Sequence, residues 1–291
     1  MPNNPTANNF NGGGLTAYAE FLGVDPTNTA DLVGKVIGGD LANQITVEQV
    51  LNYGASFNPV PEVLYNGNYP VLLALETSNN TVNTSSMSQL EVIIQADADL
   101  LPSSLPSSAI GTTTLTVTGA RSVDIYLGDL GVALPTGNGG FANGGAYPGD
   151  NFHLVLNDTG NDQVYGGNDD GDTVYAGGGQ DHIVLGTGTG DQLYAGTGNH
   201  QFLEANGSHA YIAAPGPNSG DYITLDGGSG FGDLILGGAG RYDTLIGSTG
   251  GSDTIVEGTG KDQTAIAMAA NDTLTGGSGV GCWGPARKCI C

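Results

Sequence analysis

Basic residues are scarce in this chain of 291 residues, which has 6 Lys and Arg residues against 29 Asp and Glu residues and a formal net charge of −23. Such a chain has too few cationic side chains to neutralise phosphates, so its composition argues against a nucleic-acid binder. The same acidity argues against docking on an anionic membrane surface. A run of about 18 apolar residues does not occur, so the sequence predicts no transmembrane segment.

Cysteine is also scarce, and its three copies all lie within the last ten residues, at Cys282, Cys289 and Cys291. A disulfide therefore cannot hold the body of the fold together, and the odd count leaves one thiol free or paired between chains. Residues 1–7 contain no basic region and no apolar core. We therefore expect that a cleaved N-terminal secretion signal is absent or has already been removed.

Glycine is abundant instead, with 51 residues, and it does not follow the period of three that collagen requires. Composition divides the chain into five segments, which are a flexible N-terminus (1–11), an N-terminal domain (12–134), a Gly-rich connector (135–149), a repeat region (150–280) and a Cys-containing tail (281–291). For the N-terminal domain, a small mixed α/β or mostly β unit, we expect short helices and then strands. The helices are expected at 15–22, 30–37 and 46–53, and the strands at 71–76, 90–96, 112–118 and 123–127.

The region from residue 150 onwards repeats itself. After each Gly-rich stretch comes an acid, or twice a His, and an apolar residue usually follows two places later. The series is Asp162, Asp172, Asp181, Asp191, His200, His209, Asp221, Asp233, Asp243, Asp253, Asp262 and Asp272. Its first spacings alternate between ten and nine residues, so two members make a unit of nineteen. One short strand cannot bury its apolar residue alone, so the repeat predicts an all-β-dominated fold: a parallel β-roll, or β-solenoid, of about six stacked coils.

Stacking creates an electrostatic problem, because alternate acids of the series align along one edge of the solenoid. Carboxylates that recur in every coil repel one another in a partly dry turn, and the few Lys and Arg residues cannot compensate them all. A hard divalent cation can do so, and calcium takes six to eight oxygen ligands from carboxylates and backbone carbonyls. Softer metals favour clusters of Cys or His, which this region lacks. The repeat therefore predicts several bound Ca²⁺ ions.

The repeat resembles the G-G-x-G-x-D-x-U-x calcium-binding nonapeptides of the RTX (repeats-in-toxin) family, in degenerate copies. Two of the copies are Gly228-Ser-Gly-Phe-Gly-Asp233-Leu-Ile-Leu and Gly177-Gly-Gly-Gln-Asp181-His-Ile-Val. This resemblance implies a parallel β-roll in which each Asp binds calcium between adjacent coils, together with turn carbonyls. The metal ligands expected on this basis are Asp162, Asp172, Asp181, Asp191, Asp221, Asp233, Asp243, Asp253, Asp262 and Asp272.

His200 and His209 interrupt the series in its third coil. Because the pattern puts them on opposite edges, we interpret this coil as one that lacks calcium and is held by packing. The alternative is a transition-metal or pH-sensitive site formed by the two imidazoles.

Residues three places after the acids should point outwards, and many of them are apolar, as at Tyr165, Tyr175 and Tyr194. An outward apolar row needs a cover, which is either the segment 12–134 or a second protomer. Solenoid ends are unpaired β edges, so end-to-end stacking of copies into a filament is a further alternative. The expected partners are thus calcium ions and further copies of the chain.

These features favour a calcium-dependent, secreted or cell-surface protein with a structural or adhesive role that folds after release into a calcium-rich medium. Self-assembly into fibres is one form that this role can take. One alternative is an ice-binding β-roll, because Gly186-Thr-Gly-Thr-Gly190 places Thr residues in a turn. Another is the non-catalytic RTX module of an exported polysaccharide-active enzyme. We expect this chain itself not to be an enzyme, because no His precedes His153 and the acids of the N-terminal domain show no catalytic spacing.

Overall fold

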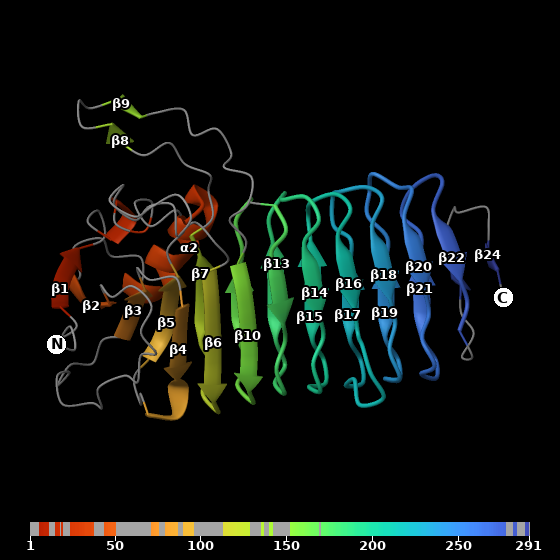
Figure 1. Cartoon of the computed structure of the whole chain (residues 1–291), viewed down its shortest axis with the longest axis horizontal. Helices are drawn as coiled ribbons and strands as arrows, with labels where there is room; N and C mark the ends of the chain where they lie inside the picture. Colours follow the sequence, from red (N-terminus) through yellow and green to blue (C-terminus); the bar gives the residue numbers. More distant parts are fainter. Residues whose placement is uncertain are drawn as a thin grey trace.

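The structure, a computed structural model, describes residues 6–11, 15–17, 19, 24–37, 44–50, 71–75, 79–86, 90–95, 113–128, 135–136, 140–141, 152–168, 170–277, 282–283 and 289–290. These residues form two long, almost entirely parallel sheets whose strands follow one another along the long axis of the molecule (Figure 1). Strand β1 lies at one end of the row of strands and strand β24 at the other (Figure 1). The all-β solenoid expected from the repeat is confirmed.

Sheet A has 12 strands and sheet B has 10. In spatial order, sheet A consists of β1 (Thr6–Asn11), β2 (Gln44–Val50), β3 (Val71–Leu75), β5 (Leu90–Gln95), β7 (Asp124–Leu127), β11 (Gln163–Tyr165), β13 (His182–Leu185), β15 (Phe202–Ala205), β17 (Thr224–Asp226), β19 (Thr244–Ile246), β21 (Thr264–Ile266) and β23 (Cys282–Trp283). Sheet B consists of β24 (Cys289–Ile290), β22 (Thr273–Thr275), β20 (Thr254–Val256), β18 (Leu234–Leu236), β16 (Tyr211–Ala213), β14 (Gln192–Tyr194), β12 (Thr173–Tyr175), β10 (Phe152–Asp158), β6 (Thr113–Gly119) and β4 (Asn79–Asn83). The helix α2 (Pro26–Ile37), the 3-10 turn η1 (Thr84–Ser86) and the antiparallel pair β8 (Pro135–Thr136) and β9 (Gly140–Phe141) complete the described elements.

Each coil of the repeat adds one strand to sheet B and the next strand to sheet A. Val174 pairs with Leu193 in the next coil, and Leu193 pairs with Ile212, each nineteen residues further on. Ile212 then pairs with Ile235, because a longer loop after β16 enlarges that coil. The register therefore keeps one inward side chain of every strand in line with its neighbours.

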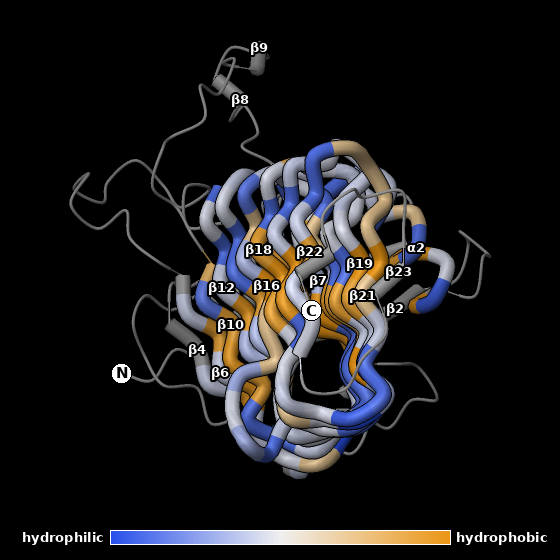
Figure 2. The backbone as a smooth tube through the Cα atoms, turned by 90° about the vertical axis from the view of Figure 1, so that its right-hand side faces the viewer, coloured by the Kyte–Doolittle hydropathy of each residue, from blue (hydrophilic) through white to orange (hydrophobic). Residues whose placement is uncertain are grey.

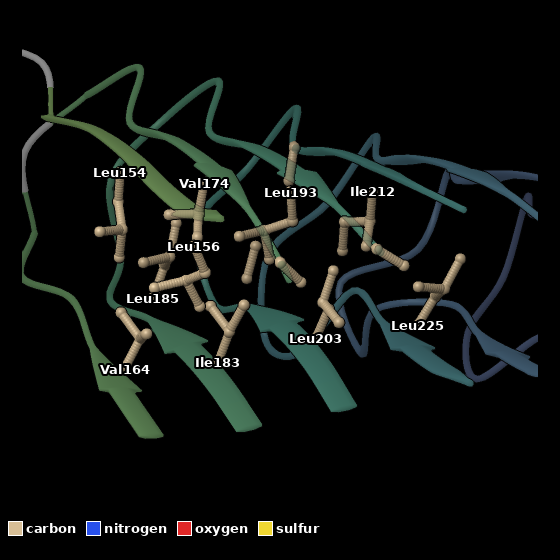
Figure 3. Packing of buried hydrophobic residues seen from close by; sticks show 14 of the residues in the cluster. Leu154, Leu156, Val164, Val174, Ile183, Leu185, Leu193, Leu203, Ile212 and Leu225 are labelled. Atoms are coloured by element: carbon tan, nitrogen blue, oxygen red, sulfur yellow. The ribbon is translucent and has the colours of Figure 1, made fainter. Parts of the chain in front are cut away.

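The core is a double row of aliphatic side chains between the two sheets. Figure 3 shows Leu154, Val174, Leu193 and Ile212 pointing from sheet B towards the side chains of sheet A. All are fully buried, as are their counterparts Val164, Ile183, Leu203 and Leu225. Burying one such side chain stabilises the fold by about 1.5–3 kcal/mol. In Figure 2, which looks along the solenoid, the apolar residues accordingly lie on the strands and many of the polar residues lie in the turns.

The two sheets continue without a break from the repeat into the N-terminal half of the chain. β7 pairs in parallel with β11, and β6 pairs in parallel with β10 over seven residues. The strands expected at 71–76, 90–96, 112–118 and 123–127 are confirmed as β3, β5, β6 and β7.

The helix α2 covers the outer face of sheet A at its N-terminal end. Leu32, Val33 and Val36 pack in one buried cluster with Ile94 of β5 and Tyr126 of β7. The Lys35 side chain forms ion pairs with the carboxylates of Asp31 and Asp124, at 3.1 Å each, and its Nζ donates to the Tyr165 hydroxyl at 2.8 Å. The N-terminal segment thus supplies a cover for the first part of the outward apolar row.

One helix prediction is wrong. The helix expected at 46–53 is instead strand β2 over Gln44–Val50, which pairs with β1 and β3. Thr46 and Gln49 have the spacing of a helix N-terminal capping box, but β-branched Ile45, Thr46, Val47 and Val50 suit a pleated strand, and pairing on both sides overrides the local signal. Among the described residues, no helix is long and apolar enough to span a membrane.

Candidate functional site

Two rows of buried side chains run along the turns of the solenoid, one residue before each strand. The first edge, where the chain passes from sheet B to sheet A, carries Asp162, Asp181, Gln201, Ile223, Asp243 and Gln263. The second edge, where the chain passes from sheet A to sheet B, carries Asp172, Asp191, Ala210, Asp233, Asp253 and Asp272. We call these the ladder positions. Every one of the twelve is at most 3% exposed.

Eight of the ten acids expected as metal ligands occupy ladder positions, namely Asp162, Asp172, Asp181, Asp191, Asp233, Asp243, Asp253 and Asp272. Asp221 and Asp262 do not, because the ladder positions of their coils are Ile223 and Gln263. Asp262 is exposed, and Asp221 forms a surface ion pair with Arg241 at 3.0 Å. Hydrogen bonds from the backbone and the guanidinium of Arg241 lower the pKa of the Asp221 carboxyl.

The register assigned to the two histidines also needs correction by one residue. Gln201 and Ala210 hold the ladder positions, while His200 and His209 sit just before them with left-handed backbones, at φ 60° and 59°. The imidazole of His200 stacks on the Tyr222 ring at 4.8 Å, and that of His209 meets Phe231 edge-on at 5.0 Å. Each imidazole has an aromatic partner on its own edge.

Backbone amides hold the ladder carboxylates. The N–H of Val123 donates to Oδ1 of Asp162 at 2.9 Å, and the N–H of Asp162 donates to Oδ1 of Asp181 at 3.1 Å. The same bond joins Phe152 to Asp172, Asp172 to Asp191, Ala210 to Asp233, Ile223 to Asp243, Asp233 to Asp253 and Asp253 to Asp272, at 2.8–3.1 Å. Each carboxylate therefore satisfies the N–H that precedes a strand of the neighbouring coil. Nothing in the acid series itself indicates this role.

Burial raises the pKa of several ladder carboxyls. The pKa of Asp191 is raised to about 7, first by burial and then by the negative charge of Asp172. Burial also raises the pKa values of Asp233 and Asp243 to about 6. Both edges thus contain carboxyl groups whose ionised form is destabilised by burial in the protein interior.

Two glutamines on the first edge place an amide nitrogen inside a cage of oxygen atoms. Nε2 of Gln201 lies 3.0 and 3.2 Å from the carbonyl oxygens of Gly177 and Gly179 and 2.9 Å from Oδ2 of Asp181. Its Oε1 accepts from the N–H of Gly196 at 2.8 Å. The two carbonyls and one carboxylate therefore converge on a partly positive group.

Gln263 repeats this arrangement three coils further on. Its Nε2 lies 3.1, 3.0 and 3.0 Å from the carbonyl oxygens of Gly238 and Gly240 and from Oδ2 of Asp243. Its Oε1 accepts from the N–H of Gly258 at 2.7 Å. Because the same contacts recur in two coils, the oxygen cage is a feature of the turn geometry and does not depend on one local sequence.

Glycine is needed where the turn carbonyls of one coil touch the next coil. A Cβ added to Gly179 would overlap the carbonyl oxygen of Gly160, and one added to Gly198 would overlap that of Gly179. The Gly-rich stretches thus let the coils stack with their turn carbonyls in close contact.

One pair of acids on the first edge lacks such partners. Asp158, at the end of β10, is 7% exposed, and Asp162 is fully buried. Neither carboxylate oxygen of Asp158, nor Oδ2 of Asp162, has a well-formed hydrogen bond. Burial and the mutual proximity of the two carboxyls raise the pKa of Asp162, and burial raises that of Asp158. Asp158 was not among the expected ligands, because it lies outside the repeating acid series.

Within the described residues, no three or more His, Cys, Asp and Glu side chains come together in a way that could hold a metal ion. A cation at either edge would therefore draw many of its ligands from backbone carbonyls. Comparisons of the chain with protein-family models, curated proteins and solved structures return no match.

Proposed function

We propose that this chain is a calcium-stabilised β-solenoid with a structural or adhesive role outside the cell. The observation that carries the proposal is the pair of ladders, in which eight Asp side chains are at most 3% exposed in a chain of net charge −23. Each buried carboxylate accepts a backbone N–H, which offsets only part of the cost of burying a charge. Calcium accepts the same mixture of carboxylates and turn carbonyls that these edges provide.

Unpaired oxygen atoms support a role for cations on both edges. Besides the three at Asp158 and Asp162, Oδ2 of Asp233 and Oε1 of Glu257 are buried without a well-formed hydrogen bond. Buried carboxylate oxygens without donors are costly unless a proton or a cation compensates them. Calcium is scarce in the cytosol and plentiful outside cells, so a fold with this requirement suits an extracellular setting.

The outer face of sheet B supports a structural or adhesive role. The rings of His153, Tyr175, Tyr194 and Tyr211 follow one another along the solenoid, with centroids 5.4, 4.6 and 5.5 Å apart. Tyr175 and Tyr194 are nearly parallel, so their faces are turned towards each other and the column presents ring edges and hydroxyls to partners. A repetitive surface of this kind, between two solenoid ends that carry sheet edges, suits assembly with further copies.

The experiment that tests the proposal is thermal unfolding of the full chain after exhaustive chelation and after calcium is restored, followed by circular dichroism. We expect calcium to raise the midpoint by about 10 °C or more, because a ligand that binds only the folded state stabilises it by mass action. Electron microscopy of the calcium-loaded protein then tests for filaments. An identical melting curve with chelator and with calcium would contradict the proposal.

Ice binding is a second candidate, which one feature of sheet A favours. Thr224, Thr244 and Thr264 occupy adjacent, paired positions on β17, β19 and β21. Neighbouring parallel strands lie about 4.8 Å apart, so the three residues form a regular column on the outer face. Thermal hysteresis measured with and without calcium tests this candidate, and none is expected if the role is only structural.

A further inference from the structure

The first edge contains one turn that has the oxygen cage but no amide to fill it. In the pairing of β11 with β13, the turn at Asp162 corresponds to the turn at Asp181, which Gln201 fills from the following coil. The residue that follows Asp162 along the edge is Asp181, whose carboxylate has no hydrogen to donate. Its Oδ2 instead accepts from the N–H of Gly177 at 3.0 Å and from Gln201.

Carboxyl groups replace the amide in this turn. Asp158 stands nineteen residues, or one coil, before Gly177 and occupies the equivalent position of its own turn. This turn therefore has a carboxyl side chain at a position where the Gln201 cage has only a glycine. A Cβ on Gly177 would lie 2.9 Å from Oδ1 of Asp158, so that glycine leaves room for the added carboxylate. Three carboxylate oxygens, two from Asp158 and one from Asp162, are consequently buried there without a well-formed hydrogen bond.

We propose that Asp158 and Asp162 bind one divalent cation of the calcium type, with turn carbonyls completing its oxygen shell. This inference deepens the proposed function and rests on it, because it identifies one turn as a principal calcium site and gives it a ligand from outside the repeating acid series. Two carboxylates and several carbonyls are a hard, all-oxygen set that suits calcium better than a softer metal. In the Gln201 and Gln263 turns the amide nitrogen takes the place of the cation, so those turns need none.

The position of the site gives it a defined structural consequence. Oδ1 of Asp162 accepts from the N–H of Val123, directly before β7, and β7 pairs with β11. A cation at Asp162 therefore fastens the strands of the N-terminal half to the first coil of the repeat. Cation binding should slow local opening at this junction and not in the coils that the glutamines close.

Peptide-resolved hydrogen–deuterium exchange on the full chain tests the inference, with chelator and with calcium, in the natural protein and in Asp158→Asn. Calcium should slow exchange in residues 119–128 and 158–165 by about a hundredfold when it is present at about one hundred times its dissociation constant. The Asp158→Asn variant should lose this local response. Glu204→Gln, which removes a charge from the outer face of β15, is the matched control and should keep the response.

Each other outcome has a definite meaning. If calcium protects other turns but not residues 158–165, or protects Asp158→Asn equally, the inference is wrong and the proposed function stands. If calcium protects no part of the chain, both fail, and the two carboxyls share a proton. If Asp158→Asn does not fold, the location of calcium protection in the natural protein decides between these results.

Discussion

The turn at Asp181, which Gln201 fills, and the turn at Asp162 lie on neighbouring coils of the same edge and meet the same structural requirement differently. In the first, an amide nitrogen lies within 3.2 Å of two carbonyl oxygens and a carboxylate oxygen. In the second, three carboxylate oxygens are buried without a well-formed hydrogen bond. At a turn with a buried ladder carboxylate, the compensating donors can come from within the chain, as Gln201 shows. A uniform repeat in the backbone therefore does not imply a uniform need for cations.

A substitution that forces neighbouring coils apart should have the largest effect on the free energy of unfolding, because it disturbs both kinds of turn. In Gly179→Ala the new Cβ overlaps the carbonyl oxygen of Gly160, so neighbouring coils must move apart. We expect a loss of about 4 kcal/mol or a failure to fold, whether or not calcium is present. Chemical denaturation measures this loss. Gly34→Ala in α2, where a Cβ meets nothing within 4 Å, is the control and should be neutral or stabilising.

Replacing the amide by a carboxylate should convert the first kind of turn into the second. Gln201→Glu puts a negative charge where Nε2 contacts Oδ2 of Asp181, at a position that is 1% exposed. We expect the chelated protein to lose about 3 kcal/mol, because a buried charge is left without a partner. Calcium should restore much of this loss. Gln180→Glu makes the same change at an exposed turn position, and an equal loss there would contradict the explanation.

Lowering the pH should stabilise the folded state of the cation-free protein. The folded-state pKa values of Asp191, at about 7, and of Asp233 and Asp243, at about 6, lie above the ordinary value for Asp. Between these values and the ordinary one the folded state binds more protons than the unfolded state, so stability falls as the pH rises.

We expect the melting midpoint of the chelated protein to be about 5 °C lower at pH 8 than at pH 5. Calorimetry at several pH values measures this change. Calcium should weaken or reverse the trend, because binding requires ionised carboxylates. Asp191→Asn should flatten the profile of the chelated protein, and a profile as steep as that of the natural protein would argue against the role of this carboxyl.

Charge removal at a surface acid outside the ladder positions should have the smallest effect. Asp221 belongs to the acid series of the sequence, but its side chain lies at the surface beside Arg241. Surface ion pairs contribute little to stability, so Asp221→Asn should change the midpoint by about 1 °C at most. The calcium response should also be unchanged, as measured by the melting shift. If Asp221→Asn lost the calcium-induced melting shift, Asp221 would be a calcium ligand, as the acid series predicts.

The acid series predicts the coil length and both edges, yet it misplaces individual residues where the coil pattern changes. At Phe202-Leu203 two apolar residues are adjacent, and the series counted from His200 selects Phe202 as the inward one. The structure buries Leu203, which moves the ladder position to Gln201. A shift of one residue exchanges the two faces of a strand, so an error of this size decides which side chains enter the turn.

The hydrogen bonding within the turns is even harder to predict from the sequence than the register. The excess of acids over Lys and Arg residues predicts that the carboxylates need cations, but the backbone N–H groups of Val123 and Asp162 also compensate them. Asp158 carried no signal of its own, since it stands four residues before a member of the series and is the last residue of an unusually long strand.

Amino-acid order alone determined that this chain winds into coils of about nineteen residues, because short apolar strands separated by Gly-rich turns can be buried only by stacking. It also determined that acids line the turns. Which of those acids are buried, which are satisfied by an amide and which are left with unpaired oxygens was decided only in three dimensions. The reason is that each turn is completed by atoms of the neighbouring coil, nineteen or more residues away, whose alignment depends on how the inward side chains of both sheets pack.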